Sequence, residues 1–197
     1  GPEATYLVMA PLFHAAGSLA VLATVWIGGC QVIIPGFEAA AALDAIAAEQ
    51  VTATLGVPTM IAALAEEQLA RPRQVGSLRS LAHGGSPIAT EVVRRTHMAF
   101  PSTELIHAYG ATETAPLVTL LRHEERRVAL DPPLSCGQAI AGVDVRVVDP
   151  SGHDLPPGEI GEVVVRGPNV MQGYWNKPEQ TADALRHGWY HSGDLGC

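Results

Sequence analysis

The sequence predicts an α/β fold, in which a parallel sheet flanked by helices is followed by a small antiparallel β-rich, barrel-like subdomain. Two observations predict it. Up to residue 109, short apolar runs alternate with helical stretches across short connections, a pattern typical of parallel strands covered by helices. After residue 131, period-2 alternation between Gly-rich turns is typical of antiparallel hairpins. We therefore expect an α/β subdomain at 1–131 and a β-rich subdomain at 132–197, joined at Pro132-Pro133.

Five short, largely apolar runs predict the strands of the parallel sheet, because strands buried on both faces lack a regular polar alternation. Helices are expected between them. Pro58 stands at the first helical position, which tolerates proline, and Met60, Ile61 and Leu64 follow at helical spacing. Ser86-Pro87 likewise predicts a cap and a helix-opening proline. The expected strands are 6–10, 30–34, 52–55, 78–83 and 104–109, and the expected helices are 17–27, 39–50, one starting at 58, and 86–100.

The β-rich part is predicted from a different spacing. Residues 143–148 alternate between valine and polar residues, as in a strand with one buried face. A turn at 150–152 and a break at 158–161 follow, and 162–166 is the next expected strand, which Gly167-Pro168 ends. These features indicate a hairpin-rich unit of about 65 residues.

The composition excludes several classes of protein. The 197 residues carry a net charge of −8, with 16% charged and 47% hydrophobic residues. Disordered chains combine low hydrophobicity with high charge, and broad nucleic-acid binding needs a basic face, so neither is expected. The three cysteines, Cys30, Cys136 and Cys197, form no Cys-x-x-Cys pair, which indicates neither a disulfide framework nor a zinc cluster. A reducing, cytoplasmic location is expected.

The uncharged stretch 15–34 is close to the length of a membrane span. Gly28-Gly29 interrupts it, and the nearest flanking charges are Glu3 and Glu38 rather than lysine or arginine. Spanning helices usually have a basic cytoplasmic flank. We therefore expect a buried helix, a glycine turn and a buried strand, with neither a transmembrane segment nor a signal peptide.

The first candidate ligand residues follow the strand 104–109, because parallel sheets bind ligands beyond the carboxyl ends of their strands. Tyr109 offers a flat face for stacking a base, and Gly110 lets a ligand approach the backbone. Thr112 offers a hydroxyl to a phosphate, and Glu113 is an oxygen ligand suited to Mg²⁺. These residues favour a nucleotide site, although an ordinary glycine turn with an exposed glutamate explains them equally well on their own.

Other candidates lie in three further segments. Gly84, Gly85 and Ser86 stand between a strand and a helix, where backbone N–H groups favour anions, and a plain turn is the alternative. His14 follows the first strand, and a structural role is the alternative. Asp194 lies in an expected Gly-rich loop, where a carboxylate can accept both hydroxyls of a ribose, and a surface turn is the alternative.

Four segments, in order, resemble the adenylate-forming superfamily, which includes acyl-CoA synthetases, adenylation domains of peptide synthetases and beetle luciferases. They are PLFHAAG at 11–17, HAYGATE at 107–113, GEIGEVVVRGPNVMQGYWNKPEQT at 158–181 and GWYHSGDLG at 188–196, with GGSP at 84–87 between the first two. PLFH and GYWNKPEQT are more similar to acyl- or aryl-CoA ligases than to peptide-synthetase domains.

The resemblance implies a two-step reaction. A carboxylic acid, expected to be a fatty acid, attacks the α-phosphate of Mg-ATP and gives an acyl-adenylate and pyrophosphate. The thiol of CoA then displaces AMP and forms a thioester. By motif position, the resemblance implies that Tyr109 stacks on adenine and that Gly84, Gly85 and Ser86 wall the adenine and acyl pockets. It further implies that Thr112 bonds the α-phosphate, that Glu113 binds Mg²⁺, that Asp194 holds the ribose hydroxyls, and that His14 lies at the acyl pocket or its gate.

The sequence also departs from the family pattern. Ser192 stands where threonine is usual, and Ala141 where proline is common. The family's Gly/Ser/Thr-rich phosphate loop and its C-terminal adenylation lysine do not occur in the 197 residues, so the chain resembles an internal fragment of the N-terminal domain. We expect such a fragment to be inactive alone and to expose surface through which copies could self-associate. A peptide-synthetase or luciferase-like adenylating domain, and a non-catalytic nucleotide-binding α/β module, are the alternatives.

Overall fold

The computed structural model describes residues 3–123 and 135–197, which form two compact units. The first unit comprises Gly1–Tyr109 and Leu120–Gly137, and the second comprises Gly110–Thr119 and Gln138–Cys197. Residues 110–119, which the sequence-based division assigns to the α/β subdomain, are thus grouped with the β-rich residues. The expected linker Pro132-Pro133 lies outside the described residues.

The first unit is built on a sheet whose order is β2-β1-β3-β4-β5-β6. Pairing is parallel from β2 through β5, so the predicted α/β fold class is confirmed. β5 has the expected bounds, and the other expected strands are shifted by one or two residues at their ends. The strands are β1 (Thr5–Val8), β2 (Cys30–Ile33), β3 (Ala53–Gly56), β4 (Ser80–Gly84), β5 (Glu104–Tyr109) and β6 (Thr119–Arg122).

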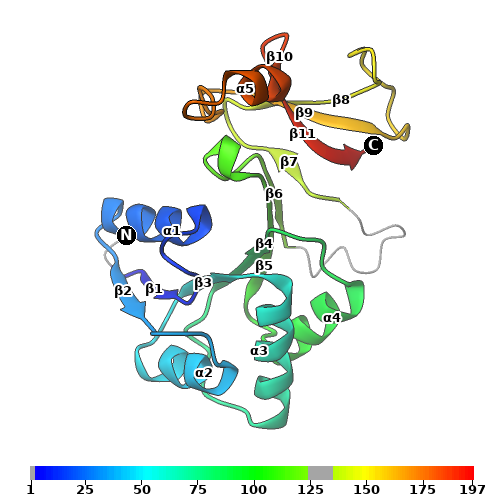
Figure 1. The fold of residues 1–197 in the computed structure, drawn as a ribbon. Coiled ribbons are helices and arrows are strands. Elements are labelled where there is room, and N and C mark those ends of the chain that lie inside the picture. Colours follow the sequence, from blue (N-terminus) through cyan, green and yellow to red (C-terminus); the bar gives the residue numbers. More distant parts are fainter. Residues whose placement is uncertain (1–2, 124–134) are drawn as a thin grey trace. The chain divides into compact units, whose positions relative to one another are not determined.

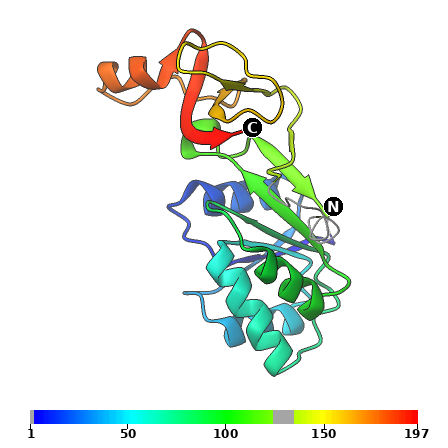
Figure 2. The same cartoon turned by 90° about the vertical axis from the view of Figure 1, so that its right-hand side faces the viewer.

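Three helices cover one side of this sheet, and a fourth lies on the other side (Figure 1). The three are α2 (Ala39–Ala48), α3 (Pro58–Ala70) and α4 (Thr90–Ala99), and Figure 2 places them along the same side of the strands. The fourth is α1 (Ala15–Trp26), which packs on β1 and β2. The side chains buried between α2, α3, α4 and the strands include Leu7, Leu43, Ile46, Ile61, Leu64, Leu81 and Leu105.

Two expectations about the helices are wrong. The uncharged helix α1 is not buried, since Leu22 and Trp26 are 67% and 91% exposed; composition predicted its apolar character but not how many neighbours it has. The helix expected at 86–100 is α4, which begins at Thr90 rather than at Ser86-Pro87. Ala89 precedes it in an extended conformation (φ −72°, ψ 138°), which keeps residues 86–89 outside the helix.

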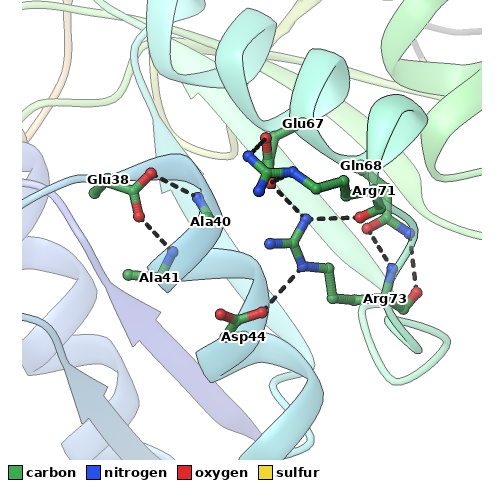
Figure 3. Close-up of polar contacts among 8 residues, drawn as sticks. All are labelled: Glu38, Ala40, Ala41, Asp44, Glu67, Gln68, Arg71 and Arg73. Carbon is green, nitrogen blue, oxygen red and sulfur yellow. Dashed lines mark hydrogen bonds and ion pairs between the residues drawn. The ribbon is translucent and has the colours of Figure 1, made fainter.

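Polar side chains join α2 to the end of α3 (Figure 3). The Glu38 carboxylate caps α2 by accepting hydrogen bonds from two backbone N–H groups of its first turn. Arg73, just after α3, donates to Asp44 of α2 at 3.0 Å and to Glu67 of α3 at 2.7 Å. Because the chain runs from here into the start of β4, this network lies on the amino-end side of the parallel strands.

The second unit contains a four-stranded antiparallel sheet in the order β10-β11-β9-β8. The expected hairpin of β8 with β9 is confirmed, and its Val164 and Val165 are buried. The expected Gly-rich loop around Asp194 is instead part of a strand, β11, at a point where its pairing with β9 is irregular. The elements are β7 (Gln138–Ala139), β8 (Asp144–Val148), β9 (Gly161–Arg166), α5 (Pro178–Ala184), β10 (Leu185–Arg186) and β11 (Trp189–Gly196).

No helix among the described residues has both the length and the apolar character that crossing a membrane requires. The uncharged stretch examined above forms α1, which is 12 residues long, and then β2.

Candidate functional site

The candidate residues divide between the two units. Residues 84–86, Tyr109 and His14 belong to the first unit, whereas Gly110, Thr112, Glu113 and Asp194 belong to the second. Each set is therefore considered within its own unit.

In the first unit, the ends of β4 and β5 bring residues 84–86 and Tyr109 to one edge of the sheet. The two strands are neighbours, with Gly84 paired opposite Ala108. Gly85 and Ser86 are exposed, and Tyr109 is half-buried. One residue inside this edge, the rings of His83 and His107 stack with their centroids 4.7 Å apart, and His83 is fully buried. Stacked imidazole rings thus lie directly before the carboxyl ends of β4 and β5 that carry the candidates.

His14 makes a local structural contact. It is the N-cap of α1, and its Nδ1 accepts a hydrogen bond from the Ala16 N–H at 3.2 Å. The side chain is exposed. This contact satisfies one of the unpaired N–H groups at the start of the helix, and a role for His14 in the acyl pocket stays a prediction.

In the second unit, residues 110–117 form a tightly held segment around a 3₁₀ turn at Thr112–Thr114. A Cβ atom at Gly110 would collide with the Pro116 carbonyl oxygen, so only glycine fits there. The Asn169 amide donates to the Thr114 and Leu117 carbonyls, each at 2.8 Å. The segment therefore presents the exposed Thr112 and the half-buried Glu113 from a fixed backbone.

Glu113 has two partners in the stretch that follows β9. The Tyr174 hydroxyl donates to its Oε1 at 2.8 Å, and the Met171 N–H donates to its backbone carbonyl at 2.8 Å. The hydrogen bond to the Glu113 carboxylate raises the pKa of Tyr174, and partial burial adds to the effect. The carboxylate is thereby held in one orientation by a neutral donor.

The Tyr190 phenol is influenced electrostatically by both acidic candidates of this unit, Glu113 and Asp194. Its side chain is buried on β11. Its pKa is raised to about 12, mainly by burial and in smaller part by the nearby Glu113, Tyr174 and Asp194. An anion near a phenol opposes its ionisation only at short range, so Glu113 and Asp194 both lie within electrostatic reach of one phenol. The structure thus brings together these two candidates, which are 81 residues apart in the sequence.

The chemistry of Glu113 fits a magnesium ion carried by a phosphate ligand. Mg²⁺ in proteins is typically held by one or two carboxylates together with substrate phosphates and water. Glu113 supplies one such carboxylate, and the exposed Thr112 hydroxyl is its neighbour. Within residues 3–123 and 135–197, no group of three or more His, Cys, Asp or Glu side chains is placed to hold a metal ion.

Sequence reasoning missed the residues that hold the candidates in place. Asn169, Tyr174 and Tyr190 were not singled out, because nothing in their local sequence links them to residues 110–117. Asn169 and Tyr174 do lie in the stretch 158–181, and Tyr190 in 188–196, whose resemblance to the adenylate-forming superfamily was noted. That resemblance was the one feature that could have indicated them.

Comparison with known proteins gives a consistent result. The family model described as "AMP-binding enzyme" matches residues 1–175. A feruloyl-CoA synthase of Amycolatopsis sp is 43% identical over 193 residues, covering 96% of this chain and 38% of the relative. The medium-chain fatty-acid–CoA ligase of Escherichia coli K12 is 37% identical, covering 96% of this chain and 33% of the relative.

A comparison with solved structures also finds a coenzyme A synthetase. O-succinylbenzoate coenzyme A synthetase of Bacillus subtilis, in complex with ATP and a magnesium ion, superimposes with a TM-score of 0.88 at 28% identity, covering all of this chain and 39% of that one. This chain thus spans well under half the length of the proteins it matches. The match over most of its residues shows that the chain belongs to the AMP-binding enzyme family.

Proposed function

We propose that this chain is the nucleotide-binding part of an AMP-forming acid–CoA ligase. The reaction converts a carboxylic acid, ATP and CoA into an acyl-CoA, AMP and pyrophosphate through an acyl-adenylate. The observation that carries the proposal is the match of residues 1–175 to the AMP-binding enzyme family. Two carboxylates of the second unit add to it: Glu113, to which the Tyr174 hydroxyl donates at 2.8 Å, and Asp194 of β11. One carboxylate suits a metal-bound phosphate, and the other suits ribose hydroxyls.

The first step of the reaction requires groups that stabilise negative charge at the α-phosphate, and Thr112 and Glu113 are the candidates for this role. As the substrate carboxylate attacks the α-phosphate, negative charge builds on the phosphate oxygens. The Thr112 hydroxyl would donate to one of them, and Mg²⁺ bound at Glu113 would supply neutralising charge. We propose that in the first unit Tyr109 stacks on the adenine beside Gly84, Gly85 and Ser86, and that His14 lies at the acyl pocket or its gate. In the second unit, Asp194 accepts the ribose hydroxyls and Gly110 lets a ligand approach the backbone.

Two classes of carboxylic acid are candidates for the substrate. The sequence resemblance favours a fatty acid, and the similarity to the Escherichia coli medium-chain enzyme supports it. An aromatic acid is a second candidate, favoured by the higher identity to feruloyl-CoA synthase. The proposed cytoplasmic location is supported by the cysteine pattern of the sequence, because Cys30, Cys136 and Cys197 form no Cys-x-x-Cys pair. We also propose that the 197 residues bind nucleotide but do not catalyse adenylation alone.

Nucleotide binding by this chain tests the proposal directly. Calorimetry with AMP should show binding that Asp194→Ala weakens about tenfold or more, the loss of roughly one charge-assisted hydrogen-bonded contact. Asp183→Ala is the matched control, because Asp183 lies in the same unit, is exposed and removes the same charge. Equal heats for wild type and Asp194→Ala would overturn the assignment of Asp194.

The reaction itself is tested in a protein of the relatives' length that contains this chain. Release of AMP and formation of CoA thioesters would be compared for medium-chain fatty acids and hydroxycinnamic acids. Thioester formation with either class supports the ligase, and the ratio of the two kcat/KM values selects the acid. AMP release without consumption of CoA would point instead to another adenylating branch.

A further inference from the structure

Asp194 lies in a bulge of β11 that the pairing with β9 defines. His191 pairs with Val164, and Leu195 pairs with Glu162. Between these pairs β11 has three residues, 192–194, whereas β9 has only Val163. A bulge leaves its extra residues out of the regular ladder, so the backbone around Asp194 needs other partners.

Glu162, on the neighbouring strand, supplies one of these partners and also contacts two side chains beside the bulge. Its Oε1 accepts the Gly193 N–H at 3.2 Å. Its Oε2 lies 2.7 Å from His191 Nδ1 and 3.5 Å from an Arg186 nitrogen. One carboxylate therefore contacts the residue before the bulge, the glycine at its centre and the adjacent strand β10.

The remaining bulge contacts are made by Ser192. Its hydroxyl donates to the Val163 carbonyl at 2.7 Å and accepts the Asp194 N–H at 3.0 Å. Gly193 has a φ of +75°, a left-handed conformation that is open to glycine at little cost. Glu162 and Ser192 thus fix the backbone on both sides of the Gly193–Asp194 peptide.

We propose that Glu162 is a positioning residue for Asp194: it holds the bulge of β11 so that the Asp194 carboxylate is aimed at the ribose hydroxyls. The proposal rests on the proposed function, which gives Asp194 that ligand. Glu162 does not touch the nucleotide. Its contribution is the order of the Gly193 and Asp194 backbone, because a carboxylate on a loose loop pays the entropy of ordering when the ligand binds.

A simple surface ion pair would not have this arrangement. The Arg186 contact is long, and the two side chains are 49% and 27% exposed; such a pair contributes little. The contacts to His191 and to the Gly193 N–H are the ones that bear on the bulge, and the His191 side chain is only 13% exposed. The contacts of Glu162 therefore indicate that it orders the bulge of β11 rather than forming an ion pair with Arg186 of β10 alone.

The first measurement is amide hydrogen exchange in the 197-residue chain without ligand. Glu162→Gln keeps the shape of the side chain, and Glu162→Ala removes both acceptors. We expect exchange at residues 192–194 to rise at least tenfold in Glu162→Ala and by less in Glu162→Gln, with Val164 and Val165 unchanged. Glu159→Gln is the matched control, since Glu159 is exposed and lies just before β9. Unchanged exchange at 192–194 in Glu162→Ala overturns the proposal.

The second measurement separates positioning from general stability. Affinities for AMP and for 2′-deoxy- and 3′-deoxy-AMP are compared by calorimetry. We expect Glu162→Ala to lower the preference for AMP over the deoxy forms at least fivefold, as Asp194→Ala does, while deoxy-AMP affinity barely changes. If Asp194→Ala loses the preference for AMP over deoxy-AMP but Glu162→Ala keeps it, only the positioning role of Glu162 is overturned. A normal preference in Asp194→Ala overturns the ribose assignment in the proposed function, and the proposal with it.

Discussion

The two units of the chain are stabilised in different ways. The first unit is packed around a continuous apolar cluster in which leucines and isoleucines from α2, α3 and the parallel strands are fully buried. In the second unit, Asn169 joins two segments outside the strands, and Glu162 and Ser192 join β9 to the bulge of β11, in each case through side-chain hydrogen bonds. The apolar cluster sets where strands end, whereas polar side chains set the conformation of the loops that carry candidate ligands.

Two charged residues make the difference concrete. Arg73 bonds to Asp44 and Glu67 and joins two helices on the amino-end side of the parallel strands. Glu162 also makes several contacts, but they converge on the bulge that carries Asp194. The number of polar contacts therefore does not distinguish a structural network from one that supports a site; the position of the contacts does.

The largest effect should come from the core of the first unit. Leu81 is fully buried in β4, and Leu81→Ala should cost about 3 kcal/mol of the free energy of unfolding, because it removes buried methyl groups and leaves a cavity. Leu22→Ala is the control, since Leu22 is 67% exposed, and it should cost less than about 0.5 kcal/mol. Urea denaturation followed by circular dichroism measures both. A loss below about 1 kcal/mol for Leu81→Ala would contradict the importance of this cluster.

The sequence was most informative where apolar residues decide the structure. Largely apolar runs predicted all five parallel strands, and the bounds of β5 were predicted to the residue. Pro58 was predicted to open a helix, and it does so in α3. These predictions succeed because hydrophobic periodicity reports which side of an element is buried, and burial determines most of the first unit.

The sequence was least informative where the partner is distant. The hydrogen bond from Tyr174 to Glu113 joins residues 61 positions apart, and Asn169 bonds to a carbonyl 55 positions away. No periodicity relates such pairs. Asp194 shows the same limit, because its strand pairing is interrupted and a Gly-rich segment predicts a loop just as well. Single side chains, rather than patterns, determine these local structures.

An intermediate effect is expected for the polar anchor of residues 110–117. Asn169→Ala removes two hydrogen bonds to the Thr114 and Leu117 carbonyls, each of which contributes about 1 kcal/mol. We expect about 2 kcal/mol of lost protection against hydrogen exchange across residues 111–118, with β9 unchanged. Gln172→Ala provides the control, because Gln172 carries the same amide group and is exposed. Equal protection in the two variants would show that Asn169 does not hold the segment.

The smallest effect is a pH dependence at the bulge. Burial alone raises the pKa of Glu162, but hydrogen bonds from His191 and the Gly193 N–H, with the charge of Arg186, outweigh it and hold the pKa below its ordinary value of 4.5. A carboxylate with a depressed pKa in the folded state contributes its stabilisation above its ordinary pKa and loses it as the pH falls through the folded value. The bulge should therefore stay ordered at neutral pH and loosen only in acid.

The amide proton of Gly193 reports this change directly, because it donates to the titrating group. Its NMR chemical shift should show a titration with a midpoint below 4.5. The titration should be absent in Glu162→Gln. If the same midpoint persists in Glu162→Gln, the shift reports Asp194 or another carboxylate. The bulge would then be fixed by Ser192 and the glycine conformation without a contribution from the charge on β9.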